Sequence, residues 1–117
     1  MRPLRAVLRR PALAHNIAVL RACAPRSRMW AVVKADAYGH GLMRLLPALT
    51  AKEKSGPDGL ALLELDAARQ VRDSGAAMPI LMLEGYFAPD ELAEFSRRRL
   101  TAVVHSLEQV AMLEAAC

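Results

Sequence analysis

The stretch Met29-Trp-Ala-Val-Val-Lys-Ala-Asp-Ala-Tyr-Gly-His-Gly41 decides how this chain is interpreted. Its first five residues are apolar and include two valines, a pattern typical of a buried strand. Two glycines close the second half and predict a loop over residues 35–41. Side chains alternate along a strand, so Trp30, Val32 and Lys34 are expected to share one face. The stretch therefore predicts a strand that ends at a lysine.

Lys34 is an unusual residue for the end of a buried strand. Burial disfavours the charged ammonium form of a lysine. That penalty disappears when the amine is neutral and bonded to a carbonyl carbon, as in a Schiff base. A lysine at a strand end can also reach solvent through its long, flexible side chain. Position alone leaves both interpretations open, so the surrounding sequence has to decide between them.

Similar signals recur along the rest of the chain. Strands are predicted at residues 4–8, 29–34, 60–63, 80–83 and 101–105. Helices are predicted at residues 11–24, from residue 42 with an interruption near Pro47, at 65–75, from 89, and from the capping-box pattern Ser106-Leu-Glu-Gln109. Residues 52–59 are predicted to form a solvated connection.

The alternation of strands and helices predicts the fold class. Four of the strands are each followed by a helix, at intervals of roughly 20 to 30 residues, which implies βα units and a parallel sheet. A complete (β/α)8 barrel of the TIM type needs about 250 residues. At 117 residues, the chain is therefore predicted to be α/β and to supply about four βα units, half of such a barrel.

Composition excludes several classes of protein. The chain is 54% hydrophobic and 24% charged, which is ordinary for a globular domain. No apolar run approaches the ~18 residues that a membrane span needs. Cys23 and Cys117 have neither metal-type nor disulfide-framework spacing, so a reducing, cytoplasmic location is expected. The three histidines are far apart in the sequence, so no metal site is predicted.

The net charge of +4 is unevenly distributed. Residues 1–35 carry eight basic residues and no acidic one, and the remainder of the chain sums to −4. An arginine-rich start can be a targeting segment or a nucleic-acid arm. However, residues 11–24 have helical apolar spacing, and no aromatic residues alternate with the arginines to stack on bases. We therefore expect neither nucleic acid nor a membrane as a partner.

The string Ala31-Val-Val-Lys-Ala-Asp-Ala-Tyr-Gly-His-Gly41 resembles the pyridoxal-phosphate attachment motif of the alanine racemase family. The resemblance extends over nearly the whole chain. His15-Asn16 resembles that family's early helix, and residues 79–85 resemble its third barrel strand. One departure lies at Arg9-Arg10, where the family usually has an acidic residue at the end of its first strand.

The resemblance implies roles for four residues. Lys34 would hold pyridoxal phosphate as an internal aldimine and, once released, would exchange a proton at the α-carbon of alanine. Tyr38 matches a family tyrosine near the cofactor phosphate, although a loop tyrosine can equally pack over a strand end. Val32 and Leu83 match apolar positions that line the cofactor pocket, and both are equally suited to a core. His40 belongs to the motif but is expected to be structural.

The resemblance also implies what lies outside these residues. In this family a tyrosine base for the opposite face comes from a C-terminal β domain of a partner subunit, and later barrel strands supply most other cofactor contacts. The chain is thus expected to be a truncated N-terminal part of the barrel domain of a homodimeric, cytoplasmic isomerase that makes D-alanine for cell wall precursors. Alone, it is expected to be inactive and either molten or self-associated. The alternatives are another pyridoxal-phosphate racemase of this barrel class, or a non-catalytic fragment that binds the cofactor.

Overall fold

The computed structural model describes residues 3–51 and 56–117. Its strands are β1 (Trp30–Val32), β2 (Gly59–Leu62), β3 (Ile80–Met82) and β4 (Leu100–Ala102). The helices are α1 (Arg10–Cys23), α2 (Lys34–Tyr38), α3 (Leu42–Leu49), α4 (Leu65–Asp73), α5 (Glu91–Arg97) and α6 (Leu107–Ala116).

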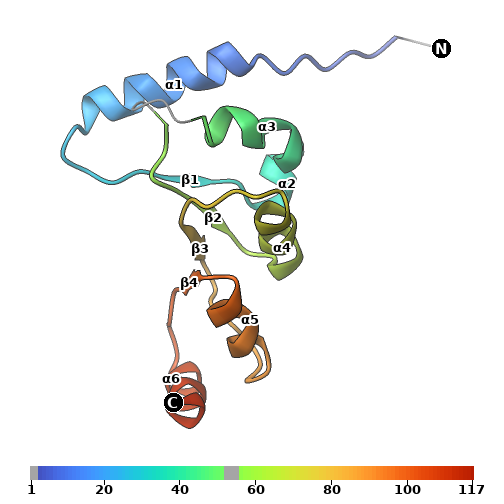
Figure 1. Cartoon of the computed structure of the whole chain (residues 1–117). Helices are drawn as coiled ribbons and strands as arrows, with labels where there is room; N and C mark the ends of the chain where they lie inside the picture. Colours follow the sequence, from blue (N-terminus) through green and yellow to red (C-terminus); the bar gives the residue numbers. More distant parts are fainter. Residues whose placement is uncertain (1–2, 52–55) are drawn as a thin grey trace.

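The strands form one parallel sheet in the order β1-β2-β3-β4. Helix α1 lies beyond the outer strand β1, and helix α6 lies beyond the outer strand β4 (Figure 1). Each strand leads to the next through a segment that contains at least one helix. The prediction of an α/β chain with four βα units is therefore confirmed.

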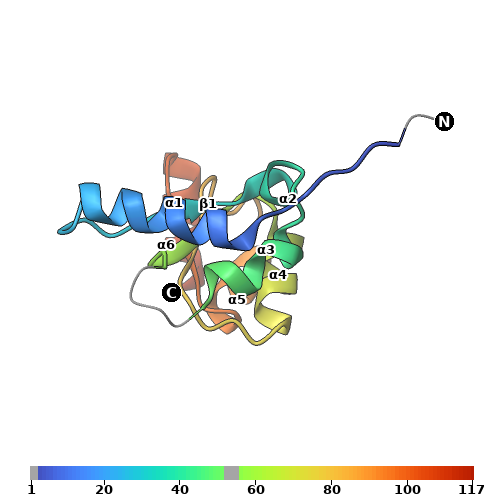
Figure 2. The same ribbon diagram turned by 90° about the horizontal axis from the view of Figure 1, so that it is seen from above.

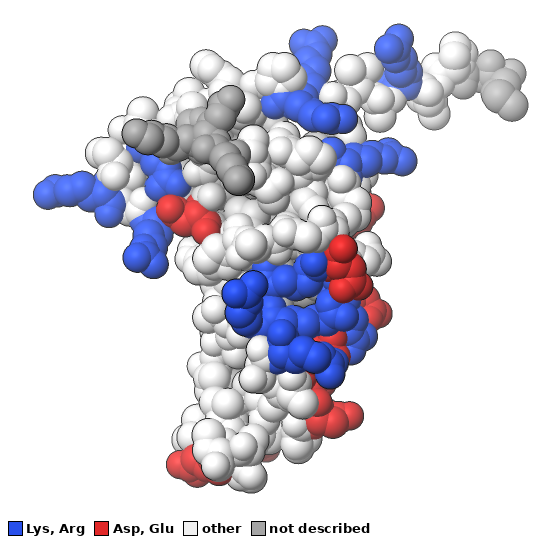
Figure 3. Space-filling view, viewed as in Figure 1, with Lys and Arg blue, Asp and Glu red and all other residues white. Residues whose placement is uncertain are grey.

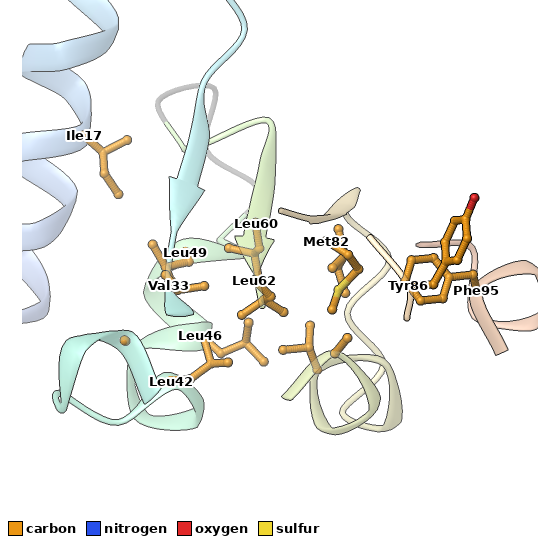
Figure 4. Close-up of a cluster of buried hydrophobic side chains, with 14 residues drawn as sticks. Ile17, Val33, Leu42, Leu46, Leu49, Leu60, Leu62, Met82, Tyr86 and Phe95 are labelled. Carbon is orange, nitrogen blue, oxygen red and sulfur yellow. The ribbon is translucent and has the colours of Figure 1, made fainter. Parts of the chain in front are cut away.

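One face of the sheet is covered by helices. Leu60, Leu62, Ile80 and Met82 point to this face, and each is at most 1% exposed. Helix α3 covers them with three leucines one helical turn apart, which are Leu42, Leu46 and Leu49 (Figure 4). Helix α4 adds Ala68 and Val71 to the same cluster. These apolar side chains hold the two middle strands in place.

The other face of the sheet is open. On this face Leu81 and Thr101 are partly or fully exposed and Val32 is 42% exposed, whereas the small Ala61 between its neighbours is buried. The radius of gyration is 16.3 Å, compared with about 13 Å for a compact domain of this length. Within the described residues, neither β1 nor β4 has a strand on its outer side. The sheet is therefore an open arc with one helical layer.

Two predictions about local structure were wrong. Residues 4–8 form no strand, and Leu4 is 97% exposed on an N-terminal segment that extends away from the other elements (Figure 2). A strand needs a partner for its backbone groups, and none of the described residues provides one. Helix α3 is not interrupted at Pro47 but continues to Leu49, with Leu46 and Leu49 buried. Burial of those leucines outweighs the lost hydrogen bond.

The predicted connection at residues 52–59 falls partly outside the described residues, which begin again at residue 56. The other predicted strands and helices are found with ends shifted by a few residues, as is usual for boundaries. No helix in the described parts of the chain is both long and apolar enough to cross a membrane.

The Gln109 side chain forms hydrogen bonds with the segments that follow β3 and β4. One of the two hydrogen bonds of the predicted capping box is present, because Ser106 Oγ accepts a hydrogen bond from the Gln109 amide. The Gln109 side chain does not return to Ser106. Its Nε2 donates to the Glu84 and Tyr86 carbonyls at 2.9 Å, and its Oε1 accepts from the His105 amide at 2.8 Å. A residue that looks like a local cap thus joins two loops.

A cluster of charged residues joins α4 to α5 on the outside of the helical layer. Figure 3 shows basic side chains grouped in the middle of this view, with acidic ones at their margin. Glu94 accepts hydrogen bonds from Arg69 at 3.0 Å, from Arg97 at 2.7 Å and from Arg98. Hydrogen bonds from Arg69 and Arg98 lower the pKa of Glu94 from its ordinary 4.5 to about 2. The three arginines therefore stabilise the ionised carboxylate.

This lowered pKa predicts how stability depends on pH. A carboxyl group whose pKa is depressed by folding contributes stability above its unfolded pKa, and the contribution is lost as pH falls towards the folded value. The free energy of unfolding, measured by urea titration, should therefore decrease progressively from about pH 4.5 to about pH 2. Glu94→Gln should flatten that dependence, whereas Glu114→Gln, at an exposed position of α6, should leave it unchanged. An equally steep loss of stability in Glu94→Gln would contradict the assignment.

Candidate functional site

The carboxyl ends of the four parallel strands meet at one edge of the sheet, the edge that carries catalytic groups in (β/α)8 barrels. Lys34 follows β1 at this edge, after Val33 has ended the strand with φ −128° and ψ 26°. Leu83 follows β3 at the same edge, where its amide donates to the Leu62 carbonyl at 2.8 Å. The structure therefore brings these two predicted site residues to the same side of the molecule.

A left-handed turn comes directly after Lys34. Four consecutive residues that are not glycine have positive φ angles, which are Ala35 (51°), Asp36 (53°), Ala37 (54°) and Tyr38 (56°). This conformation costs L-residues roughly 1–2 kcal/mol each, because Cβ approaches the following carbonyl oxygen. Strained backbone of this kind clusters at functional sites. The predicted loop at residues 35–41 is therefore a well-defined structure.

Hydrogen bonds within the segment and to α3 hold this turn. The Ala37 amide donates to the Val33 carbonyl, and the Gly39 amide donates to the Ala35 carbonyl, each at 3.0 Å. Asp36 Oδ1 accepts from the Leu42 amide at 2.8 Å. Ala37 also contributes to the core, since it is only 5% exposed. Together these contacts offset the strain.

Lys34 and Tyr38 lie at the two ends of the turn. The Lys34 side chain is partly buried, and Tyr38 is 59% exposed. Within the described residues, neither Lys34 Nζ nor the Tyr38 hydroxyl forms a hydrogen bond or ion pair with the protein. Both polar groups are thus available to a ligand at this edge of the sheet.

Val32 and Leu83 belong to the open face of the sheet. The β1–β2 register pairs Val32 with Ala61, and the β2–β3 register pairs Ala61 with Leu81, two residues before Leu83. Trp30 lies further down the same face. Its ring covers Gly59 so closely that a Cβ atom at residue 59 would lie only 2.3 Å from it. An apolar surface therefore leads from the middle of the sheet to Lys34.

The features of the site differ in how far the sequence indicates them. The glycines at 39 and 41 predicted a loop, and in the structure both have positive φ angles, at 81° and 88°. Nothing in the sequence indicated that Ala35 and Ala37 share that conformation. The bond from Asp36 to α3 could have been suspected, since aspartate often accepts hydrogen bonds from nearby backbone amides. His40 makes a local contact, with Nδ1 2.9 Å from the Ala37 carbonyl.

The residues at this edge fit the chemistry of pyridoxal phosphate. Lys34 could supply a primary amine for its aldehyde, the Tyr38 hydroxyl could reach its phosphate, and Val32 and Leu83 could form an apolar surface for its ring. No group of three potential metal ligands occurs among the described residues. A primary amine is the group that an organic carbonyl cofactor would need at this edge.

The chain matches a protein-family model described as alanine racemase, N-terminal domain, over residues 8–117. The alanine racemase of Cupriavidus necator is 50% identical over 115 residues, which cover 98% of this chain and 30% of that protein. This chain therefore spans about a third of the length of that relative. With the parallel sheet, the match confirms the predicted family and the predicted partial (β/α)8 barrel.

Solved structures give the same result. The biosynthetic alanine racemase from Pseudomonas aeruginosa superposes with a TM-score of 0.82 at 40% identity, covering 91% of this chain and 28% of that one. The histidine racemase from Leuconostoc mesenteroides superposes with a TM-score of 0.76 at 26% identity, covering 88% of this chain and 27% of that one. The arrangement of strands and helices is therefore shared with racemases of two amino acids.

The strained turn predicts an unusual response to glycine. Ala35→Gly should raise the free energy of unfolding by about 0.5–1 kcal/mol, because glycine adopts positive φ without the Cβ clash. Ala35→Val should lower it by more than about 1 kcal/mol. Urea titration followed by the fluorescence of Trp30, the only tryptophan, measures both changes.

Ala77→Gly is the matched control, because Ala77 is exposed and is not among the residues with positive φ. It should lower stability slightly, since glycine has more freedom to lose on folding. If Ala35→Gly destabilised the chain as Ala77→Gly does, residue 35 would not be left-handed in solution.

Proposed function

Because this chain belongs to the alanine racemase family, whose N-terminal domain model matches residues 8–117, we propose that it forms the N-terminal part of an enzyme that interconverts L- and D-alanine with pyridoxal phosphate. The observation that carries this proposal is Lys34 at the carboxyl end of β1, followed by a strained turn. The remainder of the enzyme would complete the barrel and supply a C-terminal β domain. The proposed enzyme is a homodimer that makes D-alanine for cell wall precursors.

Each site residue has a role in this proposal. Lys34 Nζ would hold the cofactor and would also take and return a proton at the α-carbon of the substrate. The Tyr38 hydroxyl would donate a hydrogen bond to the phosphate. Val32 and Leu83 would contact the ring and exclude water from the reacting atoms. When bound, pyridoxal phosphate supplies an electron sink that stabilises negative charge at the α-carbon.

The location of the site supports this assignment of roles. A proton acceptor must lie within hydrogen-bond reach of the substrate carbon, and residues fixed at strand ends satisfy such geometry better than residues on mobile loops. A base for the opposite face of the α-carbon would come from the remainder of the protein. The exposed, unpaired Cys23 and Cys117 suit a reducing compartment such as the cytoplasm.

A second candidate is racemisation of another amino acid. The likeness to a histidine racemase favours it, because that protein shares the fold of this segment with a TM-score of 0.76. Substrate choice depends on the groups that contact the substrate side chain. Assays with alanine and histidine side by side therefore separate the two candidates.

A chimera tests the proposed function. These 117 residues would replace the matching segment of the Cupriavidus necator alanine racemase, and D-alanine formed from L-alanine would be measured by chiral chromatography. The chimera should racemise alanine, and Lys34→Ala should reduce kcat/KM by on the order of a thousandfold or more, because it removes both the anchor and the base.

Lys52→Ala is the matched control, since it removes a different lysine, and it should keep the activity of the parent chimera. Substantial turnover by Lys34→Ala without added amine would contradict the role of Lys34. A chimera that binds pyridoxal phosphate but racemises nothing would indicate a segment that only binds the cofactor. Faster turnover of histidine than of alanine would favour the second candidate.

Tyr38→Phe should mainly weaken cofactor binding. Loss of a hydrogen bond to a charged phosphate corresponds to roughly a tenfold rise in Kd for pyridoxal phosphate. Quenching of Trp30 fluorescence during titration of the chimera measures this Kd once other tryptophans have been replaced. The kcat at saturating cofactor should change little. An unchanged Kd would show that Tyr38 only packs over the strand end.

A further inference from the structure

Asp36 lies in the middle of the left-handed turn and joins it to α3. Its carboxylate Oδ1 accepts a hydrogen bond from the Leu42 amide at 2.8 Å, and its carbonyl accepts from the Gly41 amide at 2.9 Å. The side chain and the main chain of one residue thus both bond to the segment where α3 begins. Asp36 satisfies an amide that the first turn of a helix otherwise leaves without a partner.

Helix α3, which these bonds join to the turn, is anchored in the core by three buried leucines. Leu42 is 3% exposed, Leu46 is 5% exposed and Leu49 is 3% exposed. All three pack on the residues of β2 in the covered face of the sheet (Figure 4). Through Asp36, the turn is therefore attached to a helix whose leucines are buried in the core.

We propose that Asp36 is a positioning residue, which holds the left-handed turn so that Lys34 and Tyr38 face the same ligand. The proposal rests on the proposed function of Lys34. No ion pair joins Asp36 to Lys34 in the described parts of the chain, so the carboxylate acts through the backbone and not through the lysine charge. Without the bond to Leu42, the strained residues between Lys34 and Tyr38 relax towards right-handed angles and turn the two side chains apart.

This role explains why strain persists at the end of β1. Four positive φ angles in a row need contacts from outside the turn to maintain them. The hydrogen bonds within the turn, at 3.0 Å, would form equally well in a right-handed turn. The Asp36–Leu42 bond differs from them because it depends on where the turn directs the side chain of residue 36.

The test compares Asp36→Leu, which removes the acceptor, with Asp36→Asn, which keeps an oxygen acceptor of the same size. Two quantities are measured on the chimera that carries these 117 residues. The first is hydrogen exchange at the Leu42 amide. The second is the rate at which borohydride traps pyridoxal phosphate on Lys34, relative to Lys52 and Lys54, by peptide mapping.

In Asp36→Leu, the Leu42 amide should exchange at least about tenfold faster, and trapping at Lys34 relative to the other lysines should fall by on the order of tenfold. Asp36→Asn should keep both quantities within about threefold of the parent chimera. Asp90→Ala, at an exposed position without a side-chain cap bond, should change neither. Val71→Ala, a core change in α4, controls for loss of global stability.

Several results would overturn the proposal. Normal trapping at Lys34 in Asp36→Leu, despite fast exchange at Leu42, would show that the turn does not position the lysine. An equal loss in Asp36→Asn and Asp36→Leu would show that the carboxylate charge matters and not the acceptor. An equal loss in Val71→Ala would reduce the effect to stability. If the parent chimera shows no preference for Lys34, the proposed function fails, and Leu42 exchange still decides whether Asp36 holds the turn.

Discussion

Burial of Leu60, Leu62, Ile80 and Met82 beneath the helices determines the orientation of the whole sheet, and each of these side chains is at most 1% exposed. Side chains alternate strictly along a strand, so a shift of one residue would move this apolar set to the open face. Burying a leucine or isoleucine side chain is worth roughly 1.5–3 kcal/mol. Register is therefore strongly specified, and the strand ends that carry the site follow from it.

The same constraint separates two kinds of apolar residue. Those on the covered face form the core, whereas Trp30, Val32, Leu81 and Leu83 lie on the face that a closed barrel would turn inwards. In a (β/α)8 barrel, the inward side chains pack in layers contributed by all strands. Four strands supply about half of such an interior. The open face thus explains the partial exposure of these residues, and together with the extended N-terminal segment it accounts for the large radius of gyration.

Most of the fold could be predicted from the sequence, because its signals are local. Apolar runs indicated β1 to β4, and their alternation with helices indicated parallel pairing, which the structure has. The strand predicted at residues 4–8 was wrong, since an apolar pattern cannot show whether a partner strand is present. The helix at Pro47 was also misjudged, because burial of Leu49 is a tertiary effect. Such effects override local preference.

The site could be predicted only in part. Lys34 was identified by its motif and by its place at a strand end, and the structure puts it there. The left-handed conformation of Ala35 could not be predicted, since alanine normally avoids it. Gln109 could be recognised as a capping residue but not as a link between two loops, because Glu84 and Tyr86, which accept from its Nε2, are more than 20 residues away. The sequence alone does not show contacts between distant segments.

The most direct test of this account is a crystal structure of the chimera after borohydride reduction with pyridoxal phosphate. The account predicts electron density continuous from Lys34 Nζ to the cofactor, with the ring against Leu83 on the open face and residues 35–38 still left-handed. Density that joins the cofactor to another lysine, or that places it on the helix-covered side of the sheet, would contradict the account.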